Sequence, residues 1–268
     1  MHAPLIVSIT SLPNRLGLIR PTLESLLAGE TRPDAIRLIL PETPLRGTAR
    51  FEIPDFLGDP DFCQGVVEIV RVERDWGPGT KLIGGLRTLH EPAILVIADD
   101  DNLYRADFLT GLVAAQAADH GASFSYYTTP VGGIDKGQGS DGFSFWTPNL
   151  GGIEAFFDSY VDGTNLMLHD DLWISFFLAA RGVRVENLDQ LLHGSLIYEQ
   201  VHQVEALVHL DGAQDRERLE QWGLRSLMRQ VPMPASRRRA IRLRAAARAI
   251  RNAGRRVLRA GRRFSGRG

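Results

Sequence analysis

A short apolar segment that ends in three consecutive aspartates constrains this chain most. Residues 94–98 read Ile-Leu-Val-Ile-Ala and predict a strand that is buried on both faces of a sheet. The strand runs directly into Asp99, Asp100 and Asp101. Three adjacent carboxylates at the end of a buried strand repel one another, so a bound cation is the simplest reason for all three to ionise. The segment therefore predicts a cation site at the carboxyl end of a central strand.

The spacing of these aspartates suits a hard divalent ion. In an extended segment side chains alternate, which would place Asp99 and Asp101 on one face and Asp100 on the other. Two carboxylates on one face suit Mn²⁺ or Mg²⁺, which prefer oxygen ligands and keep positions open for phosphate oxygens. The alternative is a solvated acidic turn before a helix that begins near Arg105, because aspartate also favours turns and helix caps.

Strand-like and helix-like segments alternate along most of the chain. Strands are expected at residues 5–10, 35–40, 66–72, 94–98, 123–127 and 183–188, and helices at about 20–29, 80–90, 108–118, 169–182 and 211–229. This alternation predicts an α/β fold with a mostly parallel central sheet flanked by helices, in which ligands bind beyond the carboxyl ends of the strands. We expect one domain over residues 1–210, a connecting helix over 211–235 and a basic helical tail over 236–268.

Three stretches interrupt the alternation. Residues 42–65 contain three prolines and predict a loop-rich excursion. Residues 132–142 are rich in glycine and predict a mobile loop. Residues 76–81 read Trp-Gly-Pro-Gly-Thr-Lys, a turn whose glycines would let the backbone approach a ligand closely. Lys81, at the start of the next helix and near the strand ends, is a candidate for a phosphate contact.

A second acidic pair opens the helix predicted at residues 169–182. The helix is apolar nearly all round, hence buried, and Gly182 should end it. Acids at a helix N-terminus gain about 0.3–1 kcal/mol from the helix dipole and need no function. One acid is enough for that purpose, so Asp171 or Asp170 is a candidate catalytic base. His193 is a candidate metal ligand, although a single histidine is more often structural.

Charge is distributed very unevenly along the chain. Residues 237–268 hold 13 arginines and no acid, so the rest carries 18 basic against 32 acidic residues, a net charge of −14. No apolar run approaches the roughly 18 residues of a membrane span, and no basic and then apolar leader precedes the first strand. Neither membrane spanning nor secretion is therefore expected. A lone cysteine, Cys63, excludes an internal disulfide.

The basic tail has the pattern of an amphipathic helix. Leu243, Ile250, Val257 and Phe264 recur at seven-residue steps between arginines. Such a helix can lie on an anionic membrane surface, which is the partner that we expect for residues 237–268. The alternatives are a solvated end, a helix docked on the acidic body, or a nucleic-acid contact. The last is not expected, because the tail has one aromatic residue for stacking.

Several of these segments together resemble a known family. Residues 94–104 resemble the Asp-x-Asp strand end of the GT-A glycosyltransferases, and residues 169–182 resemble their later acid-pair helix. The opening at residues 7–15 and the turn at residues 76–81 are similar to nucleotide-contacting segments of bacterial members related to family 2. The resemblance spans about residues 5–200, but residues 41–65 match no part of the family that we can place.

The resemblance implies a single GT-A-like, Rossmann-related domain that transfers a sugar from a nucleoside diphosphate sugar, expected to be a UDP-sugar. The acceptor would be a hydroxyl of a glycan or of a lipid-linked sugar in bacterial surface polysaccharide synthesis. The expected location is the cytoplasm, with peripheral attachment to the inner face of the cell membrane. Nothing in the sequence distinguishes inversion from retention.

The resemblance also implies roles for individual residues. Asp99, Asp101 and His193 would bind Mn²⁺ or Mg²⁺, and Asp171 or Asp170 would accept the proton of the acceptor hydroxyl. The nucleotide contacts expected in addition to the metal are Thr10, Arg15, Lys81, Asp99 and Asp100. A divalent cation and a carboxylate suit these tasks chemically, because the leaving diphosphate gains charge while the attacking hydroxyl loses a proton.

Two other functions fit the same sequence. A sugar nucleotidyltransferase or another metal-dependent phosphoryl enzyme could also place aspartates at strand ends. Such nucleotidyltransferases usually open with a glycine-rich loop carrying Arg and Lys, whereas residues 11–15 here read Ser-Leu-Pro-Asn-Arg. A non-enzymatic protein that binds anionic surfaces through its basic tail is the other alternative. Such a module should keep its affinity in chelator, which separates it from both enzymes.

Overall fold

The computed structural model describes residues 3–45, 49–189, 196–201 and 213–264, with the backbone alone described at residues 213–214 and 254–264. A seven-stranded sheet forms its centre, in the order β10-β6-β9-β4-β1-β2-β3. β9 runs antiparallel to β4 and β6, and the other neighbours in the sheet are parallel. The predicted mostly parallel sheet is confirmed. Its strands are β1 (Leu5–Thr10), β2 (Ala35–Pro41), β3 (Val67–Val72), β4 (Ile94–Ile97), β6 (Ala122–Ser125), β9 (Phe143–Trp146) and β10 (Arg184–Asn187).

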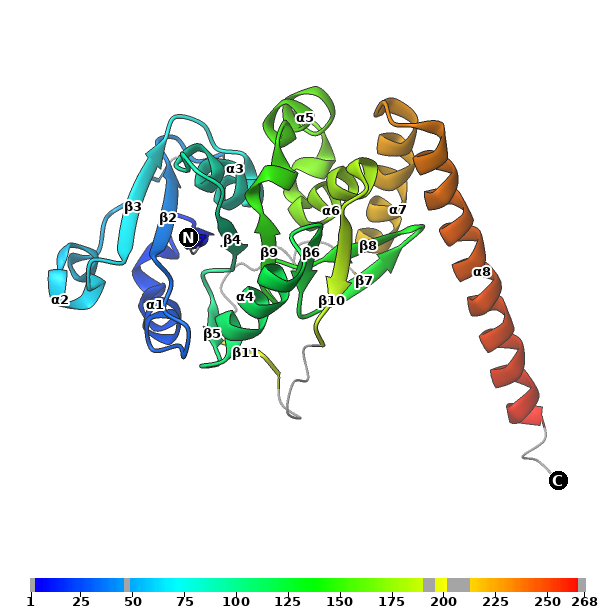
Figure 1. The fold of residues 1–268 in the computed structure, drawn as a ribbon, viewed down its shortest axis with the longest axis horizontal. Helices are drawn as coiled ribbons and strands as arrows, with labels where there is room; N and C mark the ends of the chain where they lie inside the picture. The colour runs from blue at the N-terminus through cyan, green and yellow to red at the C-terminus, as the bar shows by residue number, and fades with distance from the viewer. Residues whose placement is uncertain (1–2, 46–48, 190–195, 202–212, 265–268) are drawn as a thin grey trace.

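Helices cover both faces of the sheet (Figure 1). Along β4, Leu95 and Ile97 join one apolar core while Ile94 and Val96 join the other, so the strand is buried on both faces as predicted. α3, α5, α6 and α7 contribute to the first core, and α1 and α4 to the second. The helices are α1 (Arg20–Leu27), α3 (Thr80–Arg87), α4 (Phe108–Ala118), α5 (Ile153–Tyr160), α6 (Asp170–Arg181) and α7 (Ala213–Gln230).

The glycine-rich segment at residues 132–142 is more ordered than predicted. β7 (Thr128–Val131) and β8 (Ile134–Gly137) form an antiparallel hairpin, with Gly132 in the left-handed region at its turn. The prediction of a mobile loop over the whole segment was wrong. β8 packs on α6, with Ile134 at 1% exposure, and this tertiary contact orders a segment that local composition does not favour.

Two other local predictions need correction. The aspartates do not lead directly into a helix, because β5 (Asn102–Tyr104) follows them and pairs with β11 (Tyr198–Gln200). The helix expected at residues 108–118 is confirmed as α4. α7, which was expected only as a connecting helix, is part of the core, since Leu224 and Leu227 are buried there. The loop-rich excursion is confirmed and contains short helical turns, η2 (Asp55–Gly58) and α2 (Pro60–Cys63).

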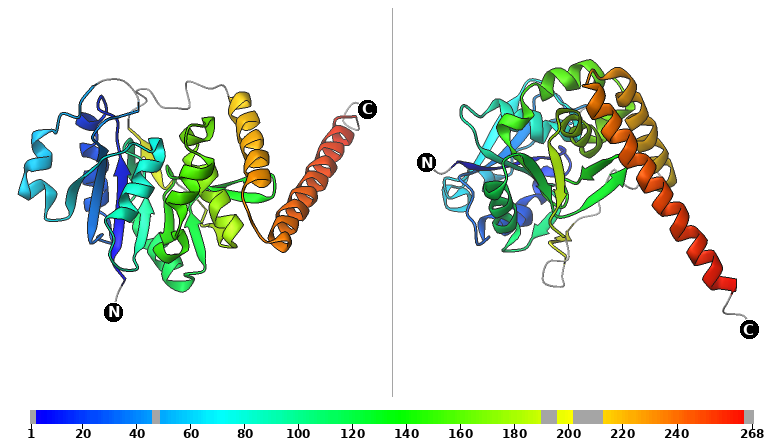
Figure 2. Two further views of the ribbon diagram at one scale, coloured as in Figure 1. Left: turned by 90° about the horizontal axis from the view of Figure 1, so that it is seen from above. Right: turned by 45° about the vertical axis from the view of Figure 1, so that its right-hand side comes forward.

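α8 (Ala235–Phe264) packs on the body near its start and then extends away from it (Figures 1 and 2). The predicted basic helix is therefore present. Within the described residues, every helix is too short or too polar to cross a bilayer.

The turn before α3 approaches another part of the protein closely. Gly77 and Gly79 belong to the short turn η3 (Gly77–Gly79), and Gly77 adopts a positive φ of 62°. A Cβ built on Gly79 would lie 2.5 Å from the ring of Trp173, a fully buried side chain of α6. Gly79 therefore lets this turn pack against α6.

Substitution Gly79→Ala should destabilise the protein by about 1–3 kcal/mol, because the Trp173 indole is enclosed and must shift to make room. Urea denaturation, followed by circular dichroism, measures the loss. Gly58→Ala is the matched control, since a Cβ there meets no heavy atom within 4 Å. Equal midpoints for the two variants would contradict this role of Gly79.

Candidate active site

The aspartate triplet and the acidic pair lie at one site. The triplet follows β4 in the turn that leads to β5, at the carboxyl end of the central strand, and the pair opens α6. Lys81, in the first turn of α3, contacts both groups. Its Nζ lies 2.5 Å from Asp99 Oδ1 and 3.5 Å from Asp170 Oδ2. Residues predicted from three separate segments are thus brought together around one ammonium group.

Arg15 organises the other two aspartates of the triplet. Its guanidinium forms an ion pair with Asp100 and lies 3.0 Å from Asp101 Oδ2. Because Asp100 and Asp101 lie in a turn rather than in an extended segment, the predicted alternation of Asp99 and Asp101 against Asp100 does not describe their placement. Arg15 bridges two neighbours that were expected on opposite faces.

Asp100 is held inside the protein by several groups. Ser11 Oγ donates to its carboxylate at 2.5 Å, and Thr22 Oγ1 donates to its carbonyl oxygen at 3.0 Å. Burial raises the pKa of Asp100 to about 6, although Arg15 and Ser11 act in the opposite direction. These contacts tie the turn to the segments after β1 and to α1.

Asp171 is positioned by the chain that follows β8. The Gly139 N–H donates to Asp171 Oδ1 at 2.9 Å. Burial raises the pKa of Asp171, and the neighbouring charge of Asp170 raises it further. Asp170 Oδ2 is buried and accepts no hydrogen bond within the described residues. Asp171 is half-buried and therefore the more accessible member of the pair.

Lys81 remains charged although its side chain is only 6% exposed. Burial alone would lower its pKa, but Asp99, Asp170 and Asp171 outweigh burial and raise it. A Cβ on Gly139 would lie 3.0 Å from Lys81 Nζ, so this glycine lets the chain pass beside the ammonium.

Residues 138–141 contribute to the site in a way that the sequence does not predict. The Ser140 carbonyl accepts hydrogen bonds from Asn102 Nδ2 at 3.1 Å and from the Tyr104 hydroxyl at 3.4 Å, which ties this segment to β5. Asp141 is 3% exposed, and burial raises its pKa to about 6. The only signal in the sequence was the glycine content of residues 132–142, which indicates close backbone approach but not the element approached.

The remaining predicted residues lie in different surroundings. Thr10 ends β1 and donates its hydroxyl hydrogen bond to the Ile39 carbonyl at 2.8 Å, so it joins β1 to β2. Its contact with a nucleotide stays a prediction. His193, the third predicted metal ligand, lies outside the residues that the structure describes. A described residue that does lie near the triplet is Gln200 of β11, whose Nε2 donates to Asp101 Oδ2 at 3.4 Å.

The donor chemistry of the triplet fits a divalent cation shared with a ligand. In the described residues no three His, Cys, Asp or Glu side chains gather closely enough to bind a metal by themselves. Asp99 uses Oδ1 and Asp101 uses Oδ2 in their described contacts, so each retains a second carboxylate oxygen. Mg²⁺ and Mn²⁺ accept such oxygens and complete their coordination with water and substrate phosphates. Asp99 and Asp101 are therefore suitable ligands for an ion that arrives with a diphosphate.

The structure is an α/β protein with strand-end aspartates facing an acidic helix start, and its fold is consistent with the expected GT-A-like fold. The sequence matches no family model and no curated protein. Among solved structures, it is similar to the mannosyltransferase PcManGT from Pyrobaculum calidifontis, determined in complex with GDP-Man and Mn²⁺. The TM-score is 0.56 at 17% sequence identity, over 99% of this chain and 81% of the other. At this identity the likeness establishes the fold.

Proposed function

We propose that the protein is a metal-dependent glycosyltransferase that moves a sugar from a nucleoside diphosphate sugar to an acceptor hydroxyl. The observation that carries the proposal is the Lys81 ammonium, which lies between Asp99 of the triplet and Asp170 of the acidic pair. A donor-binding group and a proton acceptor must lie on either side of the transferred sugar, and the triplet and the acidic pair would fill these two roles. The GDP-Man and Mn²⁺ in the structural neighbour support the same class of reaction.

Each group has a defined task in this reaction. Asp99 and Asp101 would hold Mn²⁺ or Mg²⁺, which when bound stabilises the charge that develops on the leaving diphosphate. Arg15 and Lys81 place two positive charges beside these acids and would orient the phosphates, with Thr10 and Asp100 nearer the nucleoside. Asp171, with one oxygen fixed by the Gly139 N–H, would accept the acceptor proton on its other oxygen. Asp170 would hold Lys81 in place.

The donor that we propose is a UDP-sugar, and the acceptor a glycan or lipid-linked sugar in bacterial surface polysaccharide synthesis. Residues 1–210 would form the domain that carries out the transfer reaction. Residues 211–235 would connect this domain to residues 236–268, which would attach the protein to the cytoplasmic face of the cell membrane. His193 is proposed as an additional metal ligand on sequence resemblance alone.

Thermal-shift measurements with nucleotides test the proposal directly. UDP with Mn²⁺ should raise the melting temperature more than the sum of the shifts from either alone, because each improves binding of the other. A ligand at about 100 times its Kd adds roughly 2.7 kcal/mol to the free energy of unfolding. A shift by UDP that is unchanged in EDTA would contradict the metal-dependent reaction. A larger shift by GDP would assign the donor to guanosine instead of uridine.

A further inference from the structure

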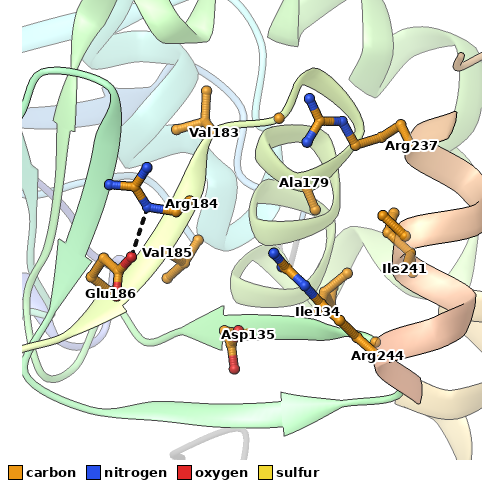
Figure 3. A pocket seen from close by; sticks show the side chains of 13 residues that line it. Ile134, Asp135, Ala179, Val183, Arg184, Val185, Glu186, Arg237, Ile241 and Arg244 are labelled. Atoms are coloured by element: carbon orange, nitrogen blue, oxygen red, sulfur yellow. Dashed lines mark hydrogen bonds and ion pairs between the residues drawn. The ribbon is translucent and has the colours of Figure 1, made fainter. Parts of the chain in front are cut away.

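α8 is fixed to the body along one face. Ile241 is 5% exposed and points into the cavity of about 190 Å³ between α8, β8 and β10, as Figure 3 shows. A Cβ at Gly133 would collide with the carbonyl of Ile241, so the helix backbone lies directly against the β7–β8 hairpin. This face of α8 therefore packs against the rest of the protein and is not free to bind a partner.

Arg248 fixes the helix two turns further on. Its guanidinium donates to the Gly132 and Ile134 carbonyls at 3.1 and 2.7 Å, and lies 2.5 Å from Asp135 Oδ1. Arg248 is seven residues after Ile241, which places it on the same side of a helix, roughly 20° away. Residues 241–248 therefore hold the first half of α8 in one orientation on the body.

The opposite face of α8 presents apolar side chains to solvent. Leu243 is 59% exposed and Ile250 is 73% exposed, the two highest values among the large apolar residues that the structure describes. At 3.6 residues per turn they lie roughly 160–180° from Ile241. Alanines 246, 247 and 253 are also exposed beside them. The described part of the apolar stripe, Leu243 and Ile250, thus points away from the body, so packing on the body does not explain it.

Arginines border this stripe. Arg242 and Arg251 lie roughly 80–100° to either side of Ile250 and are exposed, and Arg239 is exposed near Leu243. α8 contains no acidic residue. The outward face, defined here as Leu243 and Ile250 with Arg239, Arg242 and Arg251, is therefore an aliphatic strip with positively charged edges.

We infer that this outward face lies on an anionic lipid bilayer, with the two aliphatic side chains among the acyl chains and the arginines at the phosphate level. Nucleic acid would match the arginines but offers no place for Leu243 and Ile250, and the sequence of α8 contains a single aromatic residue for stacking. A second copy of α8 would bring two purely basic helices together, which like-charge repulsion opposes.

Because α8 is also docked, binding would hold the whole body in one orientation on the surface rather than tether it through a free tail. The inference deepens the membrane attachment included in the proposed function, and it does not require the transferase activity. A test by vesicle binding without donor or metal therefore fails or succeeds independently of the catalytic proposal.

Flotation of the full-length protein with vesicles tests this surface. The protein should float with phosphatidylcholine vesicles that contain 30% phosphatidylglycerol and stay in the dense fraction with phosphatidylcholine alone. Leu243→Asp/Ile250→Asp should lower the bound fraction at least tenfold at the same lipid concentration. Arg239→Gln/Arg242→Gln/Arg251→Gln should lower binding to the anionic vesicles and leave the apolar stripe intact.

The matched control is Leu45→Asp/Ile53→Asp, which makes the same chemical change at two exposed aliphatic residues in the excursion before β3. This control should float like the unchanged protein. Every variant should have the same melting temperature as the unchanged protein. The inference would be overturned if the two aspartate double variants lost vesicle binding equally, or if Leu243→Asp/Ile250→Asp floated as well as the unchanged protein. The face would be assigned to nucleic acid if RNA competed with vesicles for the protein and Leu243→Asp/Ile250→Asp bound both RNA and vesicles like the unchanged protein. A dimer that dissociates in the stripe variant would assign it to a second copy.

Discussion

Asp171→Asn should lower the turnover number about 10³-fold while donor binding is retained. Removing a general base costs roughly 10²–10⁴ in rate, and Asp171 is the accessible acid of the pair at the start of α6. The asparagine oxygen can still accept the Gly139 N–H, so the local structure should persist. Turnover is measured by UDP release in the presence of acceptor, and donor affinity by calorimetry.

The same variant should melt at a higher temperature near neutral pH. Burial and Asp170 raise the pKa of Asp171 above its ordinary value, so its ionised form destabilises the folded state. The resulting loss in the free energy of unfolding grows as pH rises from the ordinary aspartate pKa to the raised pKa of Asp171. Asparagine cannot ionise, so the variant avoids this loss. For the unchanged enzyme, activity should fall as pH decreases through the raised pKa of Asp171, because the base becomes protonated.

Asp55→Asn is a suitable control, since Asp55 is exposed and lies in η2, a separate segment from those that form the site. It should change neither the turnover number nor the melting temperature. Normal turnover in Asp171→Asn would remove Asp171 from the proposed mechanism, and Asp170→Asn would then be examined as the alternative base. A parallel loss of donor affinity would show that the residue acts in binding rather than proton transfer.

Asp101→Ala should abolish the part of UDP release that depends on Mn²⁺. A bound metal contributes several kcal/mol to stabilising developing phosphate charge, so a loss of about 10³-fold or more is expected. Arg15 keeps its ion pair with Asp100, so the turn retains one of its two anchors. Electron paramagnetic resonance of Mn²⁺ with UDP present measures metal binding apart from activity.

Two controls define this result. Asp55→Ala should bind Mn²⁺ and UDP like the unchanged protein, because it removes an exposed carboxylate elsewhere. Asp101→Asn keeps the shape of the side chain and should show the same direction of change as the alanine variant. Unaltered Mn²⁺ dependence in Asp101→Ala would exclude Asp101 as a ligand. Loss of UDP binding in the absence of Mn²⁺ would assign it to direct nucleotide contact.

The parts of the fold predicted from sequence are those with a strong local pattern. β4 is four apolar residues with both faces buried, and α6 runs from Asp170 to the residue before Gly182, which adopts φ of 86° as a left-handed helix end should. α8 and the alternation of strands and helices were also predicted. In each case the periodicity or the end signal lies within the element itself.

The remaining features depend on contacts between distant segments. The β7–β8 hairpin is ordered by α6, and no local spacing in a glycine-rich stretch reports that partner. The sequence indicated that the aspartates, Lys81 and Asp170 belong near the strand ends, but not that Arg15 would bridge Asp100 and Asp101. Asp100 and Asp101 lie in the turn between β4 and β5, a conformation that no local pattern in the triplet predicts.

Lys81 and Arg15 neutralise the aspartates of the site without a metal ion. Five aspartates from two segments converge here, and Lys81 and Arg15 supply counterions that belong to the chain itself. The aspartates therefore need no bound metal ion to stay together. The site can keep its shape whether or not a ligand occupies it, so a ligand would meet an arrangement that is already formed.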